Sequence, residues 1–495
     1  MFSEARHRFT DPARVRVFAW AAAAVLSGIL AAFLPVLVTA GLLAGAALLV
    51  VILVEPVLAL ILMLSLAPLK TLIATEAPIA LPLDVGQMGL GLALFAWLAT
   101  RQRGQPLPRT RLYLPLLIIM LGFVPSLFVA TSSGAWLSEF LKWVEMLLLV
   151  ALVVAWGSRW TWIAFGVVLA ATLQALIGLY EFMGGSGAPH LWIAGYRFFR
   201  AFGTFGQPNP FSAFMGLVLP LALGLAWGHV QAAWNAWRER PRYVRAARVA
   251  DWWMPVFWLA FYGGSALLIL AGLLASWGRG AWLGFGAAGV VMVFFAPRRR
   301  WQGAVLVAAG GVLVLMLWWA GLVPLSIQQR VDNALTEFTG FGDMRGVPIS
   351  DENYAIVERL AHWQAAYNMA NDHPFTGVGL GNYEVVYPAY GLPSWPLALG
   401  HAHNDYLNLL AETGMIGLAG YLFGWLVIGV WSLRALAVAD PVLRGMVLGL
   451  LGTWTHLMVH SVVDKLYVNN LFLHIGVLLG LLAVACTRSW NGNNT

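Results

Sequence analysis

Long apolar stretches separated by short polar ones run along almost the whole chain of 495 residues. A hydrocarbon core about 30 Å thick needs about 20 apolar residues per helix, and continuous apolar runs differ from the alternating pattern of barrel strands. The pattern therefore predicts an all-α polytopic membrane protein with about 12–14 transmembrane helices. The expected spans are 17–34, 36–54, 56–69, 85–100, 112–130, 139–157, 160–182, 210–228, 255–275, 279–297, 302–323, 414–433, 442–461 and 466–486.

Arginines gather in alternate loops between these spans, as in 101–111, 238–248 and 298–300. Basic residues in short loops stay on the cytoplasmic side during membrane insertion. This distribution predicts that both termini are cytoplasmic, and it accounts for most of the formal net charge of +7. It does not indicate nucleic-acid binding, because the arginines are not concentrated on one soluble domain. The single cysteine, Cys486, lies in the last apolar run and is expected in the core.

The spans and loops divide the chain into three expected regions. Residues 1–323 form an N-terminal transmembrane region of about 11 helices, which includes two outer arginine loops at 184–209 and 276–280. Residues 324–413 form one large outer loop with amphipathic helices. Residues 414–495 form the C-terminal transmembrane helices.

The large outer loop contains a stretch whose apolar side chains recur at helical spacing and which ends before Pro374. The Gly- and Pro-rich residues 375–400 that follow predict an ordered loop. Their glycine spacing resembles a nucleotide-binding loop only superficially, because no P-loop lysine accompanies it. The expected apolar face of the helix consists of Ile356, Leu360, Trp363, Ala366, Tyr367 and Ala370.

Two arginines, Arg200 and Arg279, stand beside glycines on the outer side, where basic residues are otherwise scarce. An arginine at the end of a span snorkels, pairs with a carboxylate or binds an anion. The planar guanidinium suits phosphate because it donates two hydrogen bonds to its oxygens. Together the two residues favour a site for a lipid phosphate or diphosphate, with ordinary contact to phospholipid headgroups as the alternative.

His403 precedes a short predicted helix that begins after Asn404 as its N-cap and ends at Gly414. The positive end of the helix dipole and the two outer arginines disfavour an imidazolium. A neutral His403 can accept a proton, which is the requirement for a general base.

Histidines and carboxylates also form two candidate metal sets, neither of which we favour. The members of the first set alternate along the chain instead of sharing a helical face, and the second set is expected to make structural hydrogen bonds. We therefore predict no metal site. The sets are His401 and His403 with Asp405 or Glu412, and His456 and His460 with Asp464.

Three segments together resemble the O-antigen ligase and O-antigen polymerase family. The stretch "HNDYLNLLAETGMIG" (403–417) is similar to its histidine signature, which leads into a membrane helix. The stretches "RAFGTFGQPNPFS" (200–212) and "SWGRGAWLG" (276–284) resemble its two arginine elements. All three occur in the family's order and on the expected outer side.

This resemblance implies a role for each residue that matches the motifs. Arg200 and Arg279 match the arginines that hold the donor's diphosphate, and His403 matches the histidine that activates the acceptor hydroxyl. The additional histidine at 401 leaves open which of the two is the base. The expected substrate-binding residues are Arg197, Asn209, His401, Asn404 and Glu412.

The implied function is transfer of a glycan from a polyprenyl (undecaprenyl) diphosphate carrier to an acceptor hydroxyl, with inversion and without a metal or cofactor. The resemblance implies a C-type glycosyltransferase architecture in the bacterial inner membrane, with the active site on the periplasmic face. The expected partners are the lipid-linked donor, a lipid-anchored or glycan acceptor and membrane lipids, and the protein is expected to be a monomer. Polysaccharide polymerisation and transfer to a protein hydroxyl share this chemistry and stay open. A flippase for lipid-linked glycans is a weaker alternative, because the chain has no clear internal repeat.

Overall fold

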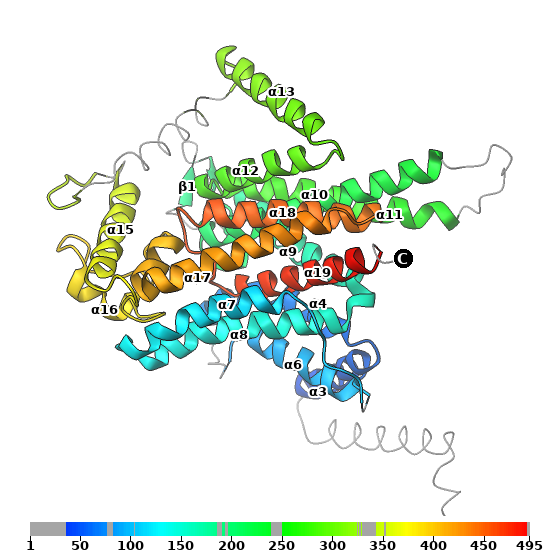
Figure 1. The fold of residues 1–495 in the computed structure, drawn as a ribbon, viewed down its shortest axis with the longest axis horizontal. Coiled ribbons are helices and arrows are strands. Elements are labelled where there is room, and N and C mark those ends of the chain that lie inside the picture. Colours follow the sequence, from blue (N-terminus) through cyan, green and yellow to red (C-terminus); the bar gives the residue numbers. More distant parts are fainter. Residues whose placement is uncertain are drawn as a thin grey trace, which may run out of the picture.

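Apolar helices form a bundle in the computed structural model of this protein (Figure 1). Within the described residues, eight helices are long and apolar enough to cross a membrane, and four shorter apolar helices accompany them. The fold is therefore the all-α polytopic membrane fold that the apolar pattern predicts. The structure describes residues 36–76, 83–102, 104–185, 191–193, 197–238, 250–323, 325, 328, 343–350 and 353–492.

Most helices of the bundle coincide with an expected span, and the first expected span, 17–34, lies outside the described residues. The bundle helices are α3 (Val36–Val54), α4 (Val57–Leu66), α6 (Val85–Thr100), α7 (Tyr113–Phe123), α8 (Ser133–Ala155), α9 (Trp160–Phe182), α10 (Pro208–Arg238), α11 (Ala250–Ala275), α12 (Arg279–Phe295), α13 (Arg300–Trp319), α17 (Asp405–Ala435), α18 (Pro441–His460) and α19 (Leu471–Gly492).

Helix α8 starts six residues before the span expected at 139–157. Its start is fixed by Ser132, whose hydroxyl accepts a hydrogen bond from the amide of Ala135 at 3.2 Å. The six added residues, 133–138, include the buried Trp136, and the ion pair of Glu139 with Lys142 lies within the expected span. Apolar counting missed this part of the helix because Ser133, Gly134 and Ser138 interrupt its apolar residues.

Short elements cover one end of the bundle, which we call the α15 end (Figure 1). Helix α15 (Tyr354–Asp372) forms where the apolar spacing predicted it, although Tyr367 is exposed and does not belong to the buried face. Helix α16 (Tyr383–Tyr390) lies within the segment expected to be a loop. Both helices contact α17, and the two-stranded hairpin of β1 (Trp192–Ile193) and β2 (Phe198–Phe199) precedes α10.

A kink at Gly414 divides α17 into an end segment and a long membrane segment. Gly414 has a φ of 62°, a backbone conformation that favours glycine. The amide of Met415 therefore donates to the carbonyl of Pro374 at 2.8 Å. On the other side of the kink, the amide of Val378 donates to the carbonyl of Ala411 at 2.9 Å. The expected helix end at Gly414 is thus a real break, and residues 374–379 satisfy the backbone groups that it frees.

Glycines let α10 and α18 pack with their backbones close together at the centre of the bundle. A Cβ atom on Gly224 would meet the carbonyl oxygen of Gly445 and would lie 2.7 Å from the Cα atom of Gly449. Small residues at helix contacts are the usual means of close packing in membranes.

We expect Gly224→Ala to lower the melting temperature of the purified protein, because an extra methyl at a backbone contact costs about 1–3 kcal/mol. Gly289→Ala on α12 is the matched control, since a Cβ atom there meets nothing within 4 Å. Equal melting temperatures for the two variants in thermal unfolding would contradict the close α10–α18 contact.

Candidate functional site

A cavity of about 210 Å³ lies at the α15 end, where side chains from distant segments meet. Four of the residues expected in the site, Arg200, Asn209, Arg279 and His403, line this one cavity. The three motifs therefore form one site. The lining residues are Arg200, Asn209, Ser212, Trp277, Gly278, Arg279, Gly280, Glu358, Arg359, His403, His460, Val463 and Asp464.

The two arginine elements are hydrogen-bonded directly to each other. Arg200 donates from Nε to the carbonyl oxygen of Ser276 at 2.9 Å, and the amide of Ala201 donates to the carbonyl of Ala275 at 3.0 Å. Nη2 of Arg200 donates to Oδ1 of Asn209 at 3.5 Å. These contacts fix the plane of the guanidinium beside the turn that carries Arg279.

A buried carboxylate at the end of α9 supports the loop that follows Arg200. Oε2 of Glu181 accepts hydrogen bonds from the amides of Phe202 at 2.9 Å and Gly203 at 2.7 Å. The side-chain oxygen of Gln174 accepts from the amide and the hydroxyl of Thr204, both at 3.1 Å. The geometry of the loop after Arg200 therefore depends on two polar side chains of α9, Gln174 and Glu181.

Positive charge is concentrated at this cavity. Burial, together with the charges of Arg359 and Arg279, lowers the pKa of Arg200 to about 10. Arg200 is still charged at neutral pH. The described lining holds three guanidinium groups against two carboxylates, Glu358 and Asp464, and this excess of positive charge favours an anionic ligand.

His403 is held in a left-handed backbone conformation, with a φ of 51°. This conformation is costly for a residue other than glycine and occurs mainly where surrounding contacts enforce it. The amide of His403 donates to Nδ1 of His401 at 3.1 Å, and the amide of Ala402 donates to Oδ1 of Asn408 at 3.1 Å. The indole of Trp363 on α15 donates to the carbonyl of His403 at 3.3 Å.

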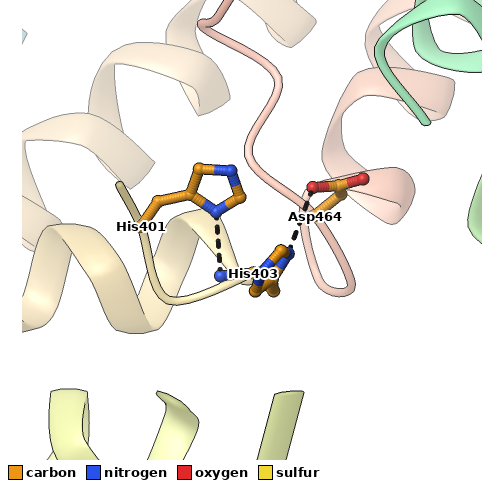
Figure 2. A group of neighbouring side chains, drawn as sticks. All are labelled: His401, His403 and Asp464. Atoms are coloured by element: carbon orange, nitrogen blue, oxygen red, sulfur yellow. Dashed lines mark hydrogen bonds and ion pairs between the residues drawn. The ribbon is translucent and has the colours of Figure 1, made fainter. Parts of the chain in front are cut away.

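Asp464, in the turn between α18 and α19, lies beside the His403 ring (Figure 2). Nδ1 of His403 and Oδ1 of Asp464 are 3.9 Å apart, within ion-pair range but too far for a good hydrogen bond. Burial opposes ionisation of Asp464, but His403 and the neighbouring histidines hold the pKa of its carboxyl below the usual range. The charged carboxylate can stabilise an imidazolium that forms on His403.

Asp405 joins the His403 turn to the turn that carries Asp464. Its Oδ2 accepts hydrogen bonds from the hydroxyl of Ser461 and from the amide of Leu466, both at 3.0 Å. Its own amide donates to the carbonyl of Ser461 at 2.8 Å. Asp405, considered from the sequence as a member of a metal set, therefore fixes the relative position of these two turns.

Of the two ring nitrogens of His403, Nδ1 faces Asp464 and Nε2 does not. Both are buried and make no hydrogen bond to any described part of the chain. An unpaired buried polar group is costly and marks a place where a ligand or water completes the bonding. In contrast, burial lowers the pKa of His401 to about 3, so His401 stays neutral and acts as the acceptor for the His403 amide.

The remaining expected site residues lie outside the cavity lining. Arg197 is exposed on the hairpin, with its guanidinium carbon 5.2 Å from the centre of the Phe198 ring. Asn404 caps α17 by accepting the amide of Leu407 at 3.0 Å. The buried Glu412 accepts the amide of Tyr383 at 3.2 Å and so ties α16 to α17.

The cavity lining also includes ionisable residues that were not among the expected site residues. They are Glu358, Arg359, His460 and Asp464. Glu358 and Arg359 lie on the polar side of α15, which sequence patterns show only as a solvated face. His460 makes the expected structural contact, with its Nδ1 atom 3.4 Å from Nε2 of His456. Asp464 could be noticed in the sequence, because an acidic residue at the end of an apolar span is unusual.

The comparison with known proteins agrees with these motifs. Residues 264–422 match the family model described as O-antigen ligase. The match includes the Arg279 turn and the His403 segment, and it confirms the family resemblance inferred from the motifs. No curated protein matches the chain.

His401, His403 and Asp464 could also hold a metal ion, since one ligand atom from each lies within 4.8 Å of the others. This trio differs from both sets considered from the sequence. Two observations oppose a dication here: Nδ1 of His401 already accepts the His403 amide, and Lys465 and the three arginines surround the trio with positive charge.

We therefore expect the purified protein to contain less than stoichiometric Zn²⁺, Mn²⁺ or Ni²⁺ when measured by elemental mass spectrometry after dialysis against each ion. His401→Ala should not change the small amount bound. One equivalent of metal that disappears in His401→Ala would contradict this expectation and would make the trio a metal centre.

Proposed function

From the family match and the shared cavity, we propose that the protein transfers a glycan from a polyprenyl diphosphate carrier to an acceptor hydroxyl. The observation that carries the proposal is the meeting of Arg200, Arg279 and His403 around one cavity. The family match indicates a lipid-linked glycan transferase of the O-antigen ligase or polymerase type. We further propose that the α15 end faces the periplasm, because the arginine-rich loops lie at the other end of the expected spans.

The arginines would bind the donor's diphosphate and stabilise it as it leaves. During transfer, the bond between the anomeric carbon and the phosphate oxygen breaks, and the oxygen takes the electron pair. Fixed guanidinium groups oppose this growing negative charge without having to reorganise. Arg359 on α15 would be a third contact, since it lines the same cavity as Arg200 and Arg279.

His403 would accept the proton of the acceptor hydroxyl as its oxygen forms the new bond to the anomeric carbon. Because Nδ1 faces Asp464, Nε2 is the nitrogen left for the acceptor. The resulting imidazolium would be stabilised by the Asp464 carboxylate. Attack from the side opposite the leaving diphosphate would invert the anomeric centre in one step.

We expect His403→Ala to lower kcat for transfer from a purified polyprenyl-diphosphate donor by a factor of about 10² to 10⁴, the usual contribution of a general base. His373→Ala is the matched control, because His373 is exposed at the end of α15 and outside the cavity. Turnover near that of the unmodified protein would exclude His403 as the base.

Arg200→Ala and Arg279→Ala should each reduce turnover by a factor of about 10² to 10³, the loss typical of removing one group that stabilises transition-state charge. Arg345→Ala is the control, since its guanidinium pairs with Asp343 on the exposed surface. Unchanged donor binding and turnover in both cavity variants would remove the diphosphate site from the proposal.

A further inference from the structure

A second and larger cavity, of about 1230 Å³, lies at the end of the bundle opposite the α15 end. Helices α10, α11, α12, α13 and α18 contribute side chains to it, and we call it the tryptophan groove. Trp227, Trp234 and Trp237, all exposed on one side of α10, form its wall, and Leu306 of α13 faces them. Helix α13 points away from the bundle (Figure 1), and only 6% of its apolar window is buried among the described residues.

Two arginines lie at this groove together with the apolar wall. Arg444 is buried, with 4% of its surface exposed, and donates to the carbonyls of Phe295 at 3.3 Å and Ala296 at 2.9 Å. Arg298 is exposed on the turn after α12. The described lining residues of the groove include no aspartate or glutamate. The nearest acid in sequence, Asp440, uses its carboxylate to accept the amides of Val442 and Leu443 at the start of α18.

The tryptophan groove lies about one bilayer thickness from the cavity at the α15 end that Arg200 and Arg279 line. Arg279 begins α12 and Arg298 follows its end, so 19 residues of mostly helical rise separate them by about 28 Å. The hydrocarbon core is about 30 Å thick. A lipid whose headgroup contacts Arg298 therefore belongs to the leaflet opposite the donor site.

We propose that the tryptophan groove binds an anionic diacyl phospholipid from that leaflet. The acyl chains would contact the tryptophans and Leu306, and the headgroup phosphate would contact Arg298 and Arg444. Tryptophan is favoured at the headgroup level of a membrane, and basic pockets between membrane helices on the cytoplasmic side recognise acidic headgroups. The groove is larger than the 300–1,000 Å³ typical of drug-sized ligands, as a two-chain lipid requires. This binding is independent of glycan transfer.

The test is native mass spectrometry of the full-length protein in detergent, mixed with equal amounts of phosphatidylglycerol and phosphatidylcholine. We expect retained phosphatidylglycerol to exceed phosphatidylcholine. Arg298→Gln should weaken phosphatidylglycerol binding about fivefold, which corresponds to about 1 kcal/mol for one arginine at an anionic surface. Arg299→Gln removes an equal charge from the neighbouring residue, which does not line the groove, and should leave binding unchanged.

A second pair of variants tests the apolar wall without changing charge. Ala233→Trp fills part of the groove and should reduce binding of phosphatidylglycerol, whereas Ala232→Trp, next to it and outside the lining, should not. Equal retention of the two lipids, or equal effects of Arg298→Gln and Arg299→Gln, would overturn the proposal. Displacement of phosphatidylglycerol by polyprenyl phosphate would also overturn it, because the groove would then hold the carrier chain.

Discussion

The hydrogen bond from Arg200 to the carbonyl of Ser276 links two loops that precede different membrane helices, α10 and α12. Both loops carry positive charge, so the cavity would open under repulsion if only side-chain contacts held them. Backbone bonding between Ala201 and Ala275 and the Glu181 carboxylate under the next residues keep the charges together. The free energy of folding thus offsets the repulsion between the guanidinium groups. An anionic ligand would find these groups already in place.

His403 is positioned by a comparable arrangement on the other side of the cavity. Its strained backbone is enforced by contacts from His401 and Trp363, and Asp405 sets the distance to Asp464. These contacts come from α15, from the start of α17 and from the turn after α18. A change in any one of them would move the imidazole relative to the cavity, although His401, Trp363 and Asp405 do not line it.

The apolar pattern predicted the membrane helices well because hydrophobic length is a local property of the chain. Gly414 and Asn404 were also predictable, since a helix break and a helix cap depend on a few neighbouring residues. Arg359 was not predictable, and Asp464 could be noticed but not placed beside His403, because both residues join the cavity through contacts between segments far apart in sequence. Arg197 illustrates the same limit in reverse: it stands near Arg200 in sequence, yet the hairpin places it outside the cavity lining.

Helix α12 connects the two arginine-lined sites and has only 17 residues, about 26 Å of helical rise. This is less than the thickness of an ordinary hydrocarbon core, and a bilayer adapts to a short helix by thinning beside it. Thinning brings the headgroup layer toward the bundle centre at Arg279. For the proposed lipid-linked diphosphate donor, thinning would shorten the distance between the headgroup layer and the guanidinium groups. Under the proposed function, bilayer thickness would therefore be a physical variable of donor access, set by the length of α12.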